Sequence, residues 1–154
     1  MTHHIYLVFT FALALAACQP NKSSTDLSLI ELHNQARQQG IKCGLLFKHK
    51  APALEWSDLL ANAAHKHSLE MVTLQRLTHI NSSNLNAGDR INAVGYQWRS
   101  YAENLAKGVY TDASVFKLWI NSPEHCNNIA NAEYTEMGAA QVNGYWTALY
   151  AKPK

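Results

Sequence analysis

Charge is scarce in this chain of 154 residues, because only 16% of them are Asp, Glu, Lys or Arg. The formal net charge is +2 and no basic stripe is present, which argues against a nucleic-acid-binding protein. No apolar run reaches the roughly 20 residues of a membrane-spanning helix. The motifs G-x-S-x-G and H-E-x-x-H are also absent, which excludes an α/β-hydrolase nucleophile elbow and the common zinc-protease helix. What remains is 47% hydrophobic residues, enough for one domain with its own core.

The N-terminal apolar run covers residues 5–17 and contains one polar residue, Thr10. This length and the small residues at its end predict a secretory signal peptide over residues 1–17, although the four residues before it include no Lys or Arg. The sequence Leu15-Ala16-Ala17-Cys18 resembles a bacterial lipobox, in which the cysteine is acylated. The alternative is a plain secretory signal with a coincidental cysteine.

These features predict an exported protein with a tether over residues 18–25 and a domain over residues 26–154. As a lipoprotein of a Gram-negative bacterium it would lie in the periplasm or on the outer membrane, which Gln19 suits; otherwise it would be extracellular. The chain has three cysteines, an odd number for a secreted protein. If Cys18 carries lipid, Cys43 and Cys126 remain, and an exported compartment permits a disulfide between them.

Capping residues and apolar spacing predict helices over residues 26–39, 58–75, 87–94 and 111–121, with Ser122-Pro123 ending the last. Strands over 134–142 and 145–151 flank Asn143-Gly144, a strong hairpin signal because both positions accept positive φ. A third strand is expected over 101–107. Helices first and a hairpin last indicate an α+β fold with helices packed on an antiparallel sheet.

Four segments look unlike ordinary scaffold. They are residues 77–80 (LTHI), 101–105 (YAENL), 119–126 (WINSPEHC) and 134–138 (YTEMG). In this order they resemble the bacterial signatures of the CAP superfamily (cysteine-rich secretory protein, antigen 5 and pathogenesis-related 1), whose domain is also called SCP. The patterns are approximately S-H, G-E-N, W-x-x-S-x-G-H and Y-T-E-x-G. The resemblance covers about residues 29–151, with Thr78, Ala102 and Glu124 as departures.

The resemblance implies a three-layer α-β-α sandwich and a surface cleft. It assigns to this cleft a candidate catalytic tetrad of His79, Glu103, His125 and Glu136, of which His79 and His125 are possible ligands of Zn²⁺ or another divalent cation. The family's animal members place their second Glu on the helix before the last His. This chain has Ser122 in that region, so Glu136 enters by the Y-T-E-x-G motif alone.

Elementary chemistry agrees in part with this assignment. Glu103 and Leu105 alternate along the predicted strand and therefore share a face. A carboxylate that faces inward is costly unless it is paired, and an imidazole is a natural partner. Two imidazoles with a carboxylate also match the ligand types of Zn²⁺.

Structural interpretations compete with each of these assignments. His79 and Glu103 could be a buried pair that fixes a loop to the sheet, and His125 could simply be held by the neighbouring disulfide. His65 and His67 are two residues apart on a predicted helix and so do not face each other, which predicts solvated surface for both. His33 is expected to have a packing or hydrogen-bonding role.

Three functions are therefore open. The preferred one is an exported, lipid-anchored domain whose His/Glu cleft binds a divalent metal, or a small-molecule, lipid or peptide ligand. The second is a His/Glu or metal-assisted hydrolase of peptides or envelope polymers. The third is a structural module whose tetrad is internal and whose partners bind the loop over residues 78–90. An enzyme is the less expected outcome, and no nucleic-acid partner is expected.

Overall fold

A computed structural model describes residues 28–154, so the predicted signal peptide, tether and Cys18 lie outside the described residues. The elements are α1 (Leu29–Gln39), β1 (Ile41–Cys43), β2 (Leu46–Lys48), β3 (Glu55–Trp56), α2 (Asp58–Leu74), α3 (Ala87–Ala93), β4 (Trp98–Lys107), α4 (Asp112–Ile120), α5 (Pro123–Ala130), β5 (Glu136–Val142) and β6 (Tyr145–Pro153). In the part of the chain described, no helix combines the length and the apolar character needed to cross a bilayer.

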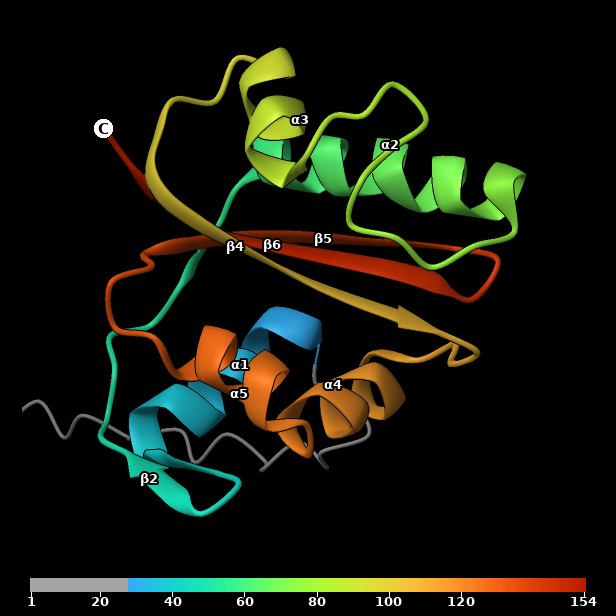
Figure 1. Cartoon of the computed structure of the whole chain (residues 1–154). Coiled ribbons are helices and arrows are strands. Elements are labelled where there is room, and N and C mark those ends of the chain that lie inside the picture. The colour runs from blue at the N-terminus through green and yellow to red at the C-terminus, as the bar shows by residue number, and fades with distance from the viewer. Residues whose placement is uncertain (1–27) are drawn as a thin grey trace, which may run out of the picture.

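These elements form three layers (Figure 1). Helices α2 and α3 cover one face of a central sheet, and α1, α4 and α5 cover the other. The sheet has the order β3-β5-β6-β4, and β6 pairs antiparallel with both β5 and β4. The α+β, three-layer prediction is confirmed, with one difference: β3 pairs with β5 in parallel, so the sheet is mixed.

The central strand β6 has apolar layers on both sides. Its residues alternate between the faces: Leu149 packs with Leu60 and Ile91 on the α2/α3 side, and Tyr150 packs with Trp119 on the other. All of these side chains are fully buried. The turn into β6 is built as predicted, because Asn143 and Gly144 have φ of 46° and 78°.

Helix α2 lies directly against the sheet at Gly138 of β5. A Cβ atom at Gly138 would lie 2.2 Å from the backbone nitrogen of Ala61. The glycine is therefore required for this close approach of helix and strand.

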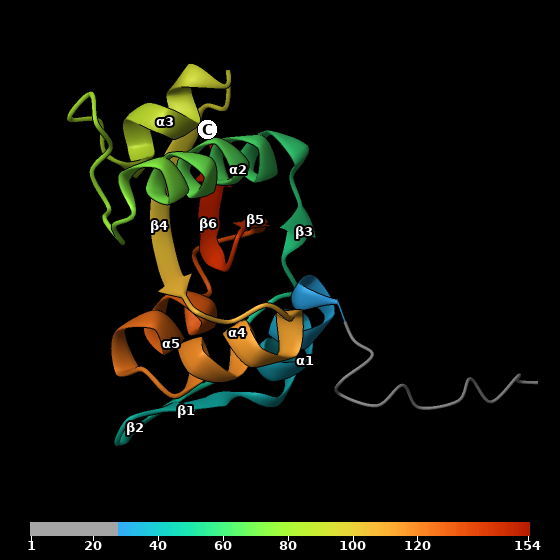
Figure 2. The ribbon, with the colours of Figure 1, turned by 90° about the vertical axis from the view of Figure 1, so that its right-hand side faces the viewer.

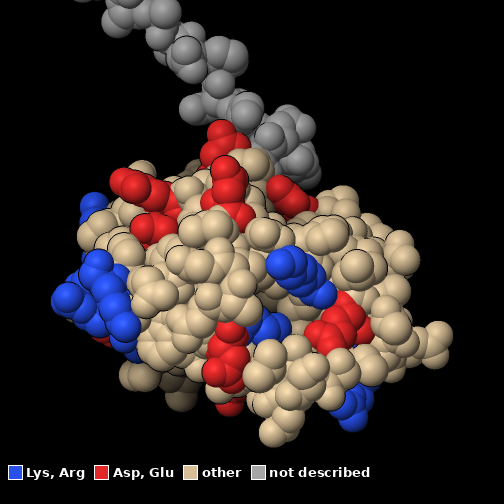
Figure 3. All heavy atoms as spheres, turned by 90° about the horizontal axis from the view of Figure 1, so that it is seen from above, with Lys and Arg blue, Asp and Glu red and all other residues tan. Residues whose placement is uncertain are grey.

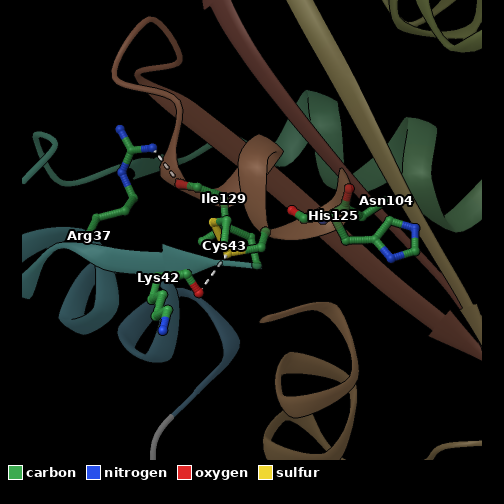
Figure 4. The surroundings of a disulfide bond; sticks show 7 residues. Arg37, Lys42, Cys43, Asn104, His125 and Ile129 are labelled. Atoms are coloured by element: carbon green, nitrogen blue, oxygen red, sulfur yellow. Dashed lines mark hydrogen bonds between the residues drawn. A yellow bond between two sulfur atoms is a disulfide. The ribbon is translucent and has the colours of Figure 1, made fainter. Parts of the chain in front are cut away.

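A second, smaller sheet is the β1–β2 hairpin, which lies beneath the α1/α4/α5 layer, on the far side of the molecule from α2 and α3 (Figure 2). The disulfide Cys43–Cys126, confirmed by the structure, joins β1 to α5. Close by, Arg37 of α1 is fully buried and donates hydrogen bonds to the carbonyls of Ile129 and of three other residues (Figure 4).

Candidate functional site

Glu103 is the centre of the candidate site. It lies in β4 opposite Leu149, so its side chain points toward the α2/α3 layer, and it is only 4% exposed. Its Oε1 accepts a hydrogen bond of 2.8 Å from Nδ1 of His79, and its Oε2 accepts one from Nη2 of Arg90. Both carboxylate oxygens are therefore engaged, as an inward-facing carboxylate requires.

Arg90, which the sequence patterns did not single out, is the second partner of Glu103. It lies in α3 and its side chain is 7% exposed. Besides Glu103, it donates from Nη1 to the carbonyls of His79 (2.9 Å) and Leu85 (3.0 Å). One guanidinium thus orients the carboxylate and holds the backbone of the loop that carries His79.

That loop, residues 78–86, is held by further hydrogen bonds. Asn81 accepts from the backbone N–H groups of Ser83 (3.0 Å) and Leu85 (2.7 Å) through its side-chain oxygen. The Glu70 carboxylate of α2 accepts from the backbone N–H of Ser82 at 2.9 Å. The loop is polar, as its sequence indicated, and it has a defined conformation that fixes the position of His79.

His67 contributes to the same loop, and the prediction that it is solvated was wrong. It is fully buried in α2, and its Nε2 donates a hydrogen bond of 2.7 Å to the carbonyl of Thr78. His65 is exposed, as predicted. The spacing argument correctly separated the two side chains but could not tell which helix face packs against the loop.

His79 keeps most of its ring in solvent, since the side chain is 61% exposed. Its pKa is raised above 6.5, chiefly because Glu103 accepts a hydrogen bond from Nδ1 and favours the charged imidazolium; partial burial opposes this rise. Because Nδ1 is engaged by Glu103, Nε2 is the ring nitrogen that remains for a ligand.

His125 is the second imidazole of the candidate site. It lies in the first turn of α5 and its pKa is lowered, first by burial and then by the positive charge of His79, while Glu124 opposes this effect. The backbone carbonyl of His125 accepts a hydrogen bond of 3.1 Å from the side chain of Asn104, the residue after Glu103, which places this turn of α5 beside the strand that carries Glu103. Its ring points away from the disulfide (Figure 4), and its Nδ1 is a buried nitrogen that lacks a protein hydrogen-bond partner in the described structure.

Asn104 supports this arrangement from the opposite face of β4. Its side-chain amide donates to the carbonyl of His125 (3.1 Å) and to the hydroxyl of Tyr150 (3.2 Å). The Tyr150 hydroxyl lies 2.9 Å from Nε2 of His33, whose Nδ1 donates to the carbonyl of Leu29 at 2.7 Å. A buried chain of hydrogen bonds thus connects α1 to the backbone at His125, and the predicted hydrogen-bonding role of His33 is confirmed.

Glu136 lies elsewhere on the sheet. Glu136 of β5 pairs with Ala151 of β6, and Ala151 pairs with Tyr101 of β4, two residues before Glu103. Glu136 therefore lies two strands away from the strand that carries Glu103. Its carboxylate lies beside the hydroxyl of Tyr96, whose pKa is raised by burial and by this negative charge. The structure therefore joins His79 and Arg90 to Glu103 and places the backbone of His125 beside the same strand, whereas the charge of Glu136 acts on Tyr96.

The candidate site offers fewer metal ligands than the tetrad implied. Over residues 28–154, no group of three or more His, Cys, Asp or Glu side chains is arranged to hold a metal ion. Both oxygens of Glu103 face protein donors, which leaves His79 and His125 as the two donors for a cation.

Comparison with known proteins agrees with the motifs. A family model described as "CAP: Cysteine-rich secretory protein family" matches residues 30–150. The chain is 29% identical over 131 residues to the uncharacterized protein YkwD of Bacillus subtilis (strain 168), covering 83% of this chain and 47% of YkwD. It is 26% identical over 105 residues to the membrane protein YlbC of the same organism, covering 68% of this chain and 30% of YlbC. The chain thus spans less than half the length of these relatives.

Solved structures share the fold. An extracellular protein with an SCP domain from Bacillus anthracis superposes with a TM-score of 0.72 at 22% identity, covering 80% of this chain and 39% of the other. An outer surface protein of Borrelia burgdorferi superposes with a TM-score of 0.63 at 20% identity, covering 82% of this chain and 87% of the other. The family model covers most of the chain, and the same three-layer fold recurs in these structures. The chain belongs to the CAP family of cysteine-rich secretory proteins.

Proposed function

We propose that this protein is an exported CAP-domain binding module whose ligand is held by the imidazoles of His79 and His125. The observation that carries the proposal is the fixed orientation of His79: a buried carboxylate anchors one ring nitrogen while most of the ring remains in solvent. An exposed imidazole that only fills space at the surface does not require a buried carboxylate to fix its orientation. The loop that carries His79 is held by Arg90, and the backbone of His125 is held by Asn104, so the positions of both residues are fixed relative to β4.

A divalent cation is the first candidate ligand. Histidines that bind metals usually donate their other ring N–H to a carboxylate or carbonyl, and His79 has this arrangement with Glu103. Two imidazoles are one protein donor fewer than the three of an open zinc site, so the other positions would belong to water or to a bound ligand. They do not fit a closed structural site.

Calorimetric titration with Zn²⁺ tests this proposal. We expect wild-type protein to bind one ion, His79→Ala and His125→Ala to lose binding, and Glu103→Gln to weaken it by about 10- to 100-fold. His65→Ala removes an exposed histidine of α2 and is the matched control. Equal heats for wild type and the double variant His79→Ala/His125→Ala would refute metal binding at this cleft.

A purely structural role for the His79–Glu103 pair gives a different pattern. If the His79–Glu103 pair only fixes the loop, His79→Ala lowers the melting temperature and changes no binding. Small-molecule, lipid and peptide ligands are screened with the same variants, so a ligand of the cleft is recognised by its dependence on both imidazoles.

Hydrolysis is a second candidate, favoured by one observation. The pKa of His79 is raised and that of His125 is lowered, so His79 is the better suited of the two to donate a proton and His125 to accept one. Casein and peptidoglycan are suitable first substrates. Activity that is unchanged in Glu103→Gln would identify a contaminant.

Export is part of the proposal. Its support is the apolar segment over residues 5–17, the paired Cys43 and Cys126, and structural relatives whose names describe an extracellular and an outer surface protein. Acylation of Cys18, which would anchor the protein to a membrane, is tested by mass spectrometry of the protein isolated from cells. An intact N-terminus with residues 1–17 attached would contradict export through a cleaved signal.

A further inference from the structure

The tip of the β1–β2 hairpin exposes three consecutive large apolar side chains. Leu45 is 95% exposed, Leu46 is 64% exposed and Phe47 is 62% exposed. A single exposed leucine is ordinary, but a run of three on a protruding hairpin indicates contact with something apolar. None of these three side chains is buried in the core, so the stability of the domain does not explain why the three residues are apolar.

Lysines surround this apolar tip. Residues 41–50 include Lys42, Lys48 and Lys50 and contain no Asp or Glu; one acid, Glu124, follows Pro123, which approaches the hairpin at Gly44. Beside the hairpin lies a recess of about 490 Å³. It is lined by Lys48, His49, Lys50, Asn127, Asn128 and Asn131, with two small alanines. Ammonium and amide groups of this kind suit phosphate oxygens.

The tip is held firmly by the fold. Cys43, which is 3% exposed at the base of the hairpin, is bonded to Cys126 of α5. The ring of Phe47 lies over Gly40, where a Cβ atom would be 2.8 Å from the ring, and Gly40 has a φ of 82°. The apolar side chains are thus presented by a covalently anchored support, which lowers the entropy lost on binding.

We propose that this hairpin docks on an anionic lipid membrane, with Leu45, Leu46 and Phe47 at the acyl boundary and the lysines at the phosphate headgroups. Apolar side chains flanked by cations are the pattern of interfacial membrane contact. A second copy of the chain is less suited to the same surface, because a two-fold contact would bring the lysines of both copies together.

Docking in this orientation leaves the loop that carries His79 accessible. The hairpin lies on the opposite side of the molecule from α2 and α3 (Figures 1 and 2), and the loop bearing His79 follows α2. The face seen from the α2/α3 side carries acidic as well as basic groups separated by uncharged residues (Figure 3). Membrane docking by the hairpin is independent of metal binding by His79 and His125.

The test uses the full chain with Cys18→Ser in every variant, which removes the acylation site and leaves Cys43 and Cys126 bonded. Leu46→Cys is labelled with an environment-sensitive NBD fluorophore and mixed with vesicles of phosphatidylethanolamine and phosphatidylglycerol at about 3:1. We expect the emission to rise severalfold and shift to the blue. The control is Leu59→Cys, because Leu59 is 44% exposed and follows the acidic Asp58. Its label should not respond.

Charge reversal and neutral lipid complete the experiment. Lys48→Glu/Lys50→Glu should weaken vesicle binding by about tenfold or more, and phosphatidylcholine vesicles should give a smaller response than anionic ones. All variants are first checked for an unchanged melting temperature. The proposal would be overturned by equal responses at positions 46 and 59 or by an absence of any effect of charge reversal. It would also be overturned by a label that responds to protein concentration and not to vesicles, which would indicate self-association.

Discussion

His79 and Glu103, 24 residues apart in the chain, are joined by a hydrogen bond of 2.8 Å between Nδ1 and Oε1. The loop that carries His79 is therefore joined to β4, which carries Glu103, by an ion pair whenever the imidazole is protonated. Because the carboxylate is buried and the imidazole exposed, the charge of this pair responds to pH while its position is fixed.

The first prediction concerns pH. The pKa of His79 is higher in the folded than in the unfolded protein, so its contribution to stability is full below about 6.5 and is lost as pH rises through the folded pKa. The free energy of unfolding lost in His79→Gln should therefore be larger at pH 5.5 than at pH 8.5. Urea unfolding measures it, with His65→Gln as the control. An equal loss at both pH values would contradict the ion pair.

His33 should give the opposite dependence. Complete burial lowers its pKa to about 4, so it stays neutral in the folded protein while the unfolded chain takes up a proton below 6.5. Stability is full above 6.5 and falls between 6.5 and 4, by about 3 kcal/mol at one pKa unit per 1.36 kcal/mol. Unfolding in guanidinium at pH 7 and 4.5 should show this loss. In His33→Gln the difference in unfolding free energy between the two pH values should be smaller, even if the variant is less stable at both.

Arg37 should be among the most sensitive positions for stability. It is fully buried and donates to the carbonyls of Pro52, Ile129, Asn131 and Tyr134 at 2.7–2.9 Å. Arg37→Ala leaves these acceptors unpaired, and breaking a buried charged network costs about 3–5 kcal/mol. Chemical denaturation of Arg37→Ala beside Arg76→Ala, an exposed arginine, measures the difference. A loss below about 1 kcal/mol would contradict the role assigned to Arg37.

A methyl group at Gly138 should separate α2 from the sheet. Its Cβ would lie 2.2 Å from the nitrogen of Ala61, a contact that only a shift of the helix can relieve. Overpacking of this kind costs about 1–3 kcal/mol. The melting temperature of Gly138→Ala is compared with that of Gly88→Ala, where the new Cβ would meet the side chain of Tyr101, which can move. The Gly138 variant should be the less stable of the two.

Sequence patterns predicted the longer elements well. Helix α2 was expected over 58–75 and spans Asp58–Leu74, because Ser57 caps it and its apolar spacing is regular. Helix α5 was missed: Ser122-Pro123 was interpreted as the end of α4, but proline at the first helical position also begins a helix. The hairpin of β1 and β2 was missed as well, since three-residue strands with exposed side chains carry too little alternation.

The site was predicted in part. Ordered motifs singled out His79 and Glu103, which are hydrogen-bonded in the structure. Arg90 has no local signal, because an arginine 13 residues before Glu103 becomes its partner only through the packing of α3 on β4. Glu136 shares a motif with the family but faces Tyr96. Side-chain partners across layers depend on tertiary register, which residue spacing along one segment does not encode.

The bond between Cys43 and Cys126 has a practical consequence. The two cysteines are 83 residues apart, and the segment between them includes His79 and Glu103. A protease that cuts once in the exposed loop over residues 78–86 would therefore produce two pieces that remain one covalent molecule, with the severed ends still hydrogen-bonded to α2 and α3. On a denaturing gel such a nicked protein would migrate as a single species until a thiol reagent released the halves.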